Sequence, residues 1–349
     1  MTGKNTNSYK IEQMRQFYEM FPYPNRFIFL TPYIASQLTT HGAFSKLVGE
    51  GQTTAAESIL TKTLRVKQRK NFQTKSVLKN LTTIFPSSKK ILLIGCGTDE
   101  PLLFRMLHQY NDLVCVELSK KNIKIARKKL FFHCLLSYFK LNFSTQGKTE
   151  FIVGDAGVIL KQKYIGQFDY IQCFGVLHHQ PNPEDLLSGI SDRLVGGGYV
   201  RIMVYSYHGR RLERKIQKKY HLFWENISKT KQFKVFIFYK LFLLRIWQLL
   251  NFFGLKKTTS LRFKYLGLNS KKVADALMHP SDPGLSLESI LPMAEKYKLK
   301  LVYCQAKLEK QGLVYGFQEP LKTWASIVSA DKKQTLLNNP ILIFSKVPE

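Results

Sequence analysis

The chain has 349 residues, 44% of them hydrophobic and 22% charged, which is typical of a folded globular protein with one large or two small domains. The five cysteines form no CxxC pair and lie mostly in or beside apolar runs, so we expect reduced core thiols in a cytoplasmic protein. The net charge of +29 indicates attraction to anions such as nucleic acid, anionic lipid or acidic substrates, or simply a lysine-rich surface. The first ten residues contain no apolar stretch, so a secretory signal is not expected.

Helical and strand-like segments follow one another along the chain in a regular order. Residues 8–40 are aromatic and interrupted by prolines, and residues 43–85 have the pattern of helices. From Lys89 onward, apolar runs alternate with helical stretches, which predicts parallel strands joined by crossover helices in a three-layer α/β domain. The expected strands are 90–95, 113–117, 150–153, 168–174 and 198–204, the expected helices are 101–110, 119–130 and 183–194, and later apolar runs at 298–304 and 340–347 are expected to complete the sheet.

A strongly basic segment, residues 208–264, separates the fifth strand from the two late apolar runs. It contains 15 Lys and Arg against two Glu, and its most apolar part is 233–255. Three basic residues within that part argue against a transmembrane helix. Its polar positions fall within an arc of about 140° at helical spacing, so we expect an amphipathic helix. Such a helix packs over the domain as a lid or docks on a membrane surface or a partner.

Two glycines follow the first expected strand, in the run Lys90-Ile-Leu-Leu-Ile-Gly-Cys-Gly-Thr98. Glycine at the carboxyl end of a strand permits a sharp turn and a close approach of the backbone to a ligand, although an ordinary tight turn has the same pattern. The next strand ends in Glu117, 22 residues after Gly95, from which a carboxylate reaches ribose hydroxyls. A dinucleotide site needs a third glycine where this chain has Glu100, so the loop favours the cationic, phosphate-free S-adenosylmethionine.

Several motifs between residues 89 and 206 resemble, in order and spacing, those of class I S-adenosylmethionine-dependent methyltransferases. They are Gly95-Cys-Gly-Thr98, Glu117, Val153-Gly-Asp155-Ala156 and Phe168-Asp-Tyr-Ile-Gln-Cys-Phe-Gly-Val-Leu-His-His179. The resemblance implies a Rossmann-like, doubly wound α/β fold with a seven-stranded sheet in the order 3-2-1-4-5-7-6, strand 7 being antiparallel. It also implies a methyltransferase that uses S-adenosyl-L-methionine and releases S-adenosyl-L-homocysteine.

A narrower similarity covers two further segments. Phe17-Tyr-Glu-Met-Phe-Pro-Tyr23-Pro24 is similar to the Tyr-Glu-x-x-Pro-Tyr-Pro opening of a bacterial methyltransferase group, and Asp275-Ala-Leu-Met-His279-Pro-Ser-Asp282 is similar to that group's segment after the fifth strand. We therefore expect four segments: a helical and aromatic N-terminal lid (1–85), a cofactor-binding core (86–207), a basic helical insertion that caps the substrate (208–284) and a C-terminal completion of the sheet (285–349).

The resemblance assigns roles to the residues that match the family's motifs. Gly95 and Gly97 are expected beside the methionine moiety, Glu117 on the ribose, Leu118 against the adenine and Asp155 on the adenine amino group. Asp99 stands where the family commonly has a third glycine, and we expect its carboxylate to accept a hydrogen bond from the cofactor's ammonium group. The predicted cofactor contacts are completed by Cys96, Ala156, Phe174 and Gly175.

Histidines and tyrosines supply the candidates for acceptor chemistry. His178 and His179 follow the fourth strand at the carboxyl edge of the sheet, where one of them is expected to act as a base or substrate contact, or both merely pack locally. His208 is a further catalytic candidate. Substrate or lid contacts are expected from Tyr18, Tyr23, Tyr205 and His279. No metal site is expected, because the two adjacent histidines lack ligand spacing.

Three functions agree with these patterns. The first is a methyltransferase acting on a small molecule or metabolite. The second is an RNA or tRNA methyltransferase whose basic surface contacts phosphates. The third is a membrane-associated protein that binds S-adenosylmethionine without turnover and makes peripheral contact through 233–255. The sequence does not predict the acceptor atom or the oligomeric state.

Overall fold

The computed structural model describes residues 3–24, 90–107, 111–139, 147–211, 213–218, 275–316 and 319–348. The predicted helices of 43–85 and the amphipathic helix of 233–255 lie outside these ranges. So does most of the basic segment 208–264. The division into four segments therefore stays a prediction.

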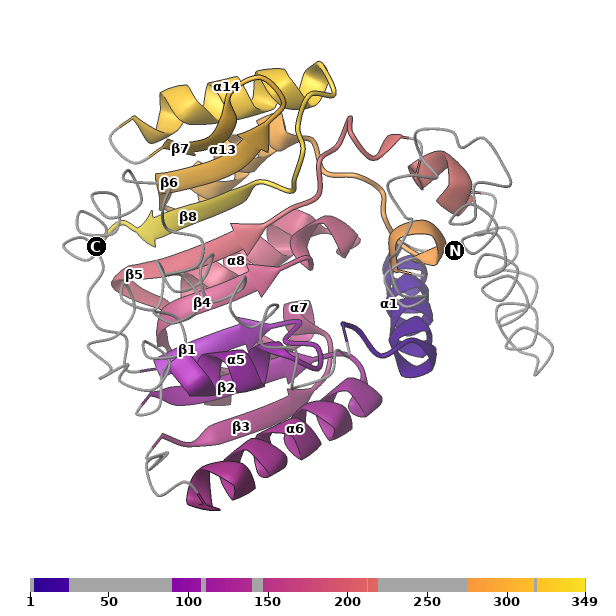
Figure 1. The fold of residues 1–349 in the computed structure, drawn as a ribbon, viewed down its shortest axis with the longest axis vertical. Coiled ribbons are helices and arrows are strands. Elements are labelled where there is room, and N and C mark those ends of the chain that lie inside the picture. Colours follow the sequence, from indigo (N-terminus) through magenta and orange to yellow (C-terminus); the bar gives the residue numbers. More distant parts are fainter. Residues whose placement is uncertain are drawn as a thin grey trace.

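The described part of the chain alternates between strands and helices, as the hydrophobic pattern predicts (Figure 1). Its elements are α1 (Gly3–Met20), β1 (Lys90–Ile94), α5 (Glu100–Leu107), β2 (Asp112–Glu117), α6 (Lys120–Phe139), β3 (Thr149–Val153), α7 (Ala156–Ile159), η2 (Lys163–Ile165), β4 (Phe168–Phe174), η3 (Leu177–His179), α8 (Pro183–Arg193), β5 (Leu194–Met203), α13 (Leu287–Lys296), β6 (Leu299–Leu308), β7 (Gly312–Gly316), α14 (Pro320–Lys332) and β8 (Ile341–Lys346).

The strands form one sheet in the order β3-β2-β1-β4-β5-β8-β6-β7. The first five strands of this order are parallel, and β8 runs antiparallel to both β5 and β6. The two late apolar runs thus take the places predicted for strands 6 and 7, and the predicted fold class is confirmed. The predicted strand count was one too low, because β7 adds an eighth strand as a hairpin partner of β6.

The core lies on both faces of the sheet, because successive side chains along a strand point to opposite sides. Leu92 and Ile94 of β1 belong to a large buried cluster that includes residues of α8, α13 and α14. Their neighbours Ile91 and Leu93 belong to a smaller cluster with Phe104 of α5 on the other face. β1 is therefore buried on both sides, as its continuous apolar run predicts.

Helix α1 lies beside the sheet where the parallel strands end (Figure 1). Phe17 is fully buried, and the Glu19 carboxylate accepts hydrogen bonds from the Ser119 hydroxyl at 3.1 Å and the Lys121 amide at 3.2 Å. These contacts fix the end of α1 to the start of α6 and place the segment that follows α1 over the loop after β1. Within the described ranges, no helix is long and apolar enough to span a bilayer.

Candidate active site

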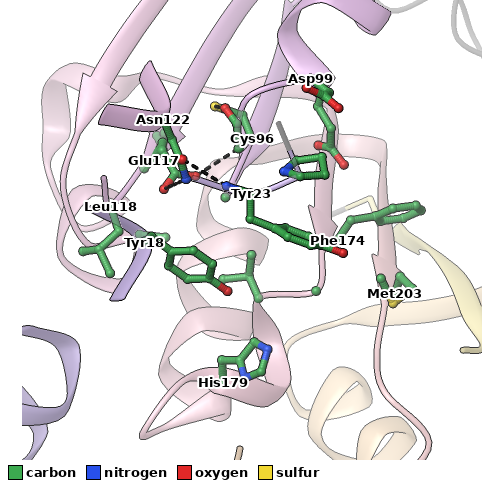
Figure 2. A pocket seen from close by; sticks show the side chains of 18 of the residues that line it. Tyr18, Tyr23, Cys96, Asp99, Glu117, Leu118, Asn122, Phe174, His179 and Met203 are labelled. Carbon is green, nitrogen blue, oxygen red and sulfur yellow. Dashed lines mark hydrogen bonds between the residues drawn. The ribbon is translucent and has the colours of Figure 1, made fainter. Parts of the chain in front are cut away.

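A cavity of about 420 Å³ opens at the carboxyl ends of β1, β2 and β4, within the size range of sites for small organic ligands. Its walls come from α1 and the loops after these strands (Figure 2). Asp275 and His279 complete the lining on one side. All ten residues predicted from the motifs to contact the cofactor line this one cavity: Gly95, Cys96, Gly97, Asp99, Glu117, Leu118, Asp155, Ala156, Phe174 and Gly175. Their individual roles stay predictions.

The glycine turn after β1 needs its glycines for two different reasons. Gly95 and Gly97 have φ of 65° and 57°, a region that other residues rarely adopt. A Cβ on Gly97 would also lie 2.7 Å from the carbonyl oxygen of Tyr23. That oxygen accepts a hydrogen bond from the Thr98 amide at 3.1 Å, so the segment after α1 is docked directly on the turn.

We expect Gly97→Ala to lower the unfolding midpoint by several degrees, which corresponds to about 2 kcal/mol. The substitution combines an unfavourable φ with displacement of Tyr23. Gly197→Ala is the matched control, because Gly197 has φ of 75° and a Cβ added there would meet no atom within 4 Å. Thermal unfolding followed by circular dichroism separates the two contributions. Equal shifts for both variants would show that the contact with Tyr23 contributes nothing.

Glu117 organises the turn through its carboxylate, which is buried at the end of β2. One oxygen accepts from the Gly97 amide at 2.9 Å, and the other accepts from the Ser119 amide at 3.0 Å and the Asn122 side chain at 3.2 Å. Burial raises the pKa of Glu117, and these hydrogen bonds oppose the rise. The carboxylate is thus held rigidly at the cavity wall between two backbone turns.

Asp99, which replaces the family's third glycine, has partners of its own. Its carboxylate forms an ion pair with Lys129 of α6 at 2.5 Å and accepts from the Thr98 hydroxyl at 2.7 Å. Both members of the ion pair line the cavity. The aspartate therefore ties the turn to α6, and its predicted contact with the cofactor's ammonium stays a prediction.

Asp155 begins α7 as its N-cap residue. Its carboxylate accepts from the Val158 amide at 3.2 Å, which satisfies one of the free amides at the helix start. Burial raises the pKa of this carboxyl. Ala156 follows inside the helix and is buried, so this short element places both predicted residues at the wall next to β3.

The cavity is acidic although the whole chain is strongly basic. Burial raises the pKa of Glu100 to about 8, and one of its carboxylate oxygens is buried without a hydrogen-bond partner among the described residues. The carboxylic and basic side chains in the described part of the lining are Asp99, Glu100, Glu117, Asp155 and Asp275 and Lys129 and Arg201. Even with Glu100 protonated at neutral pH and Asp99 paired with Lys129, the other three carboxyl groups outnumber Arg201, which favours a cationic ligand over a phosphate.

A cluster of aromatic and histidine rings forms the side of the cavity opposite the glycine turn. His179 stacks on His279 with 3.8 Å between ring centroids, and both line the cavity together with Tyr18 and Tyr205. The two tyrosine hydroxyls donate to the two oxygens of Asp275, at 3.2 Å from Tyr18 and 3.1 Å from Tyr205. The structure thus brings together residues from α1, η3, the end of β5 and the segment at 275–279.

The remaining predicted residues take different places. Tyr23 lines the cavity between Glu117 and Phe174 in the view of Figure 2. His178 is fully buried behind the wall, with its ring 3.9 Å from that of Tyr205, and it is not among the described lining residues. His208 lies beside Tyr207, also away from the lining described for the cavity.

Sequence patterns did not single out several lining residues. Asn122, five residues after Glu117, bridges that carboxylate to the backbone amide of Tyr23. Arg201 lies in β5 with its guanidinium 4.5 Å from the centre of the Phe174 ring. Asp275 is the first residue of the segment 275–282, which resembles a bacterial methyltransferase group, but only His279 of that segment was named from the sequence as a candidate site residue. Within the described ranges, no group of three or more His, Cys, Asp or Glu is arranged to hold a metal ion.

Together, the antiparallel β8, the glycine turn after β1 and the acidic end of β2 define a class I methyltransferase fold. A family model described as a methyltransferase domain matches residues 66–252, more than half of the chain. The chain therefore belongs to this methyltransferase family. S-adenosylmethionine is the cofactor of methyltransferases with this fold, and the acidic lining fits its cationic sulfonium.

Individual relatives are more distant. An uncharacterized protein of Synechococcus is 42% identical over 53 residues, which are 15% of this chain and 13% of that protein. PKMT2 of Rickettsia typhi is 19% identical, with a TM-score of 0.45, over 75% of this chain and 49% of PKMT2. A methyltransferase of Thermotoga maritima is 12% identical, with a TM-score of 0.39, over 95% of this chain and 99% of that protein. The chain thus covers less than half of the first two proteins.

Proposed function

We propose that this protein transfers a methyl group from S-adenosylmethionine to a small-molecule acceptor. The observation that carries the proposal is that all ten predicted cofactor contacts line the same cavity, beside a separate wall of tyrosines and histidines. Bound S-adenosylmethionine supplies an activated methyl group on a positively charged sulfur. The chain's own residues must then hold two ligands in line and exclude water.

The two walls support separate roles, one in binding the cofactor and the other in binding the acceptor. Glu117, held by three N–H donors, offers a fixed carboxylate to hydroxyl groups, and Asp155 offers a second one near β3. Tyr23 and Pro24 close the cavity over the glycine turn. The rings of Tyr18, His179 and Tyr205 form the opposite wall, where an acceptor would be shielded from solvent.

The test of this function is incubation of the full chain with S-adenosylmethionine labelled in its methyl group and a bacterial extract divided into metabolite, RNA, protein and lipid fractions. We expect the label to enter the metabolite fraction. Label confined to another fraction would contradict a small-molecule acceptor, and the absence of label from all four fractions would contradict turnover.

The net charge of +29 supports a second candidate, an RNA methyltransferase. The basic segment 208–264 would contact phosphates there, which predicts tRNA binding that weakens steeply between low and high salt. The acidic lining of the cavity disfavours phosphates inside it but permits a base to enter. Label in the RNA fraction of the same experiment would select this candidate.

A further inference from the structure

We propose that Asp275, Tyr18, Tyr205 and His179 form the acceptor subsite and that its acceptor is a small amine, bound as the ammonium ion. This inference rests on the proposed function and gives it a substrate class. It depends on three features of the wall: a buried carboxylate, a hydrogen-bond acceptor without a partner among the described residues, and a lining of aromatic rings.

The carboxylate of Asp275 is buried in the cavity wall, 257 residues along the chain from its partner Tyr18. Each oxygen accepts one tyrosine hydroxyl, at 3.2 Å from Tyr18 and 3.1 Å from Tyr205, and a carboxylate oxygen can accept more than one hydrogen bond. Burial raises the pKa of Asp275, while Arg210 and the two hydroxyls favour its ionised form. An ammonium group in the cavity would add a further contribution in that direction.

Arg210 does not replace a ligand's positive charge inside the cavity, because its guanidinium contacts residues behind the cavity wall. Its guanidinium lies 3.6 Å from the Asp282 carboxylate and donates to the Ala276 carbonyl at 3.1 Å. It also covers the Tyr205 ring at 3.8 Å from the ring centre, and it is not among the described lining residues. The carboxylate that lines the cavity is that of Asp275, and the one that pairs with Arg210 is that of Asp282.

His179 supplies the second acceptor. Its Nδ1 lies 2.6 Å from the Ser281 carbonyl oxygen, so Nδ1 carries the proton and Nε2 presents a lone pair. Burial lowers the pKa of His179, which favours this neutral form. Nε2 is buried and no described residue is within hydrogen-bonding distance of it. The ring appears below Tyr18 in the view of Figure 2, and His279 contacts both rings, at centroid distances of 3.8 Å to His179 and 5.5 Å to Tyr18.

Two acceptors on one wall call for a ligand with several donors. A hydroxyl group has one proton to donate, whereas an ammonium group has two or three and can satisfy both Asp275 and His179. Positive charge also suits a carboxylate and the rings of Tyr18 and Tyr23, which line the cavity, because aromatic rings attract cations. A carboxylate or phosphate ligand has no proton to donate to Asp275 or His179 and would be repelled by the Asp275 carboxylate.

The same residues account for the proton that must leave before methyl transfer. The ammonium nitrogen gives one proton to the Asp275 carboxylate, and its freed lone pair forms the new C–N bond. The C–S bond breaks at the same time, and its electron pair stays on sulfur. No oxidant, reductant or further reactant is required.

The wild-type protein provides the first test. The metabolite fraction is passed over a cation exchanger at pH 7, and the retained amines and the unretained compounds are each incubated with methyl-labelled S-adenosylmethionine. We expect the retained fraction to take at least tenfold more label. Label mainly in the unretained compounds, in RNA or in protein overturns the amine proposal while leaving methyl transfer intact.

Variants then test Asp275 itself with the retained fraction. Asp275→Asn is expected to reduce transfer roughly 30-fold or more, with binding of S-adenosylhomocysteine within threefold of wild type by calorimetry. Asp275→Glu, which keeps the charge, should recover part of the loss, and Asp185→Asn on the exposed start of α8 should change neither. Wild-type methyl transfer by Asp275→Asn overturns the subsite. So does a loss of transfer in Asp275→Asn that Asp275→Glu shows to the same extent. Failure of wild type to bind S-adenosylhomocysteine overturns the proposed function.

Discussion

Glu117→Gln is expected to weaken the binding of S-adenosylhomocysteine at least tenfold. Both carboxylate oxygens accept backbone amides, from Gly97 on one side and Ser119 on the other. Glutamine has one oxygen and one NH₂ group, so it places a donor against one of these donors in a buried site. The predicted charge-assisted hydrogen bond from Glu117 to the cofactor's ribose would be lost as well, which costs about 1.5–3 kcal/mol, or roughly 10-fold to 150-fold in affinity.

The matched control for this variant is Glu150→Gln in the neighbouring strand β3, where the side chain is exposed and does not line the described cavity. The measurement is calorimetric titration of each variant with S-adenosylhomocysteine. Wild-type affinity in Glu117→Gln would contradict the assignment of this carboxylate to the cofactor site. An equal loss in Glu150→Gln would point to a general loss of folded protein.

The free energy of unfolding is expected to fall as the pH rises through the neutral range. Burial raises the pKa of Glu100 from its ordinary value of 4.5 to about 8. Below pH 4.5 the carboxyl is protonated in both states and costs nothing. Between pH 4.5 and 8 the unfolded chain ionises while the native chain keeps its proton, so the free energy of unfolding falls. Above pH 8 the loss is complete, at up to roughly 5 kcal/mol.

Denaturant unfolding at pH 5 and at pH 8 measures this difference. Wild type is expected to lose several kcal/mol between the two pH values, and Glu100→Gln much less, because glutamine has no proton to release. A smaller slope should persist in the variant, since burial also raises the pKa values of Glu117, Asp155 and Asp275. Identical slopes for wild type and variant would show that Glu100 is ionised in the folded protein.

The parts of the site that follow from local backbone geometry were predictable from the sequence. Gly95 and Gly97 adopt positive φ at the end of a buried strand, and Glu117 ends the next strand. Each of these features is visible in the sequence as a pattern of a few neighbouring residues. The same holds for β6 and β8, whose apolar runs are long enough to stand out. β7 was missed because it has five residues and a glycine at each end.

Other parts depend on contacts between distant segments. Asp275 contacts Tyr18 across 257 residues, and Asp99 contacts Lys129 of α6 across 30 residues. Neither pairing leaves a local pattern in the sequence. His178 and His179 are adjacent in the same short helical turn, yet only His179 is among the described lining residues. That difference depends on the local backbone of η3, which the sequence pattern does not fix.

The central claim is that this cavity binds the methyltransferase cofactor, and isothermal titration of the full chain with S-adenosylhomocysteine tests it most directly. The structure predicts saturable binding at one site per chain, weakened in Glu117→Gln and retained in Glu150→Gln. No detectable binding by folded wild-type protein, at concentrations up to the millimolar range typical of weak enzyme ligands, would contradict the claim.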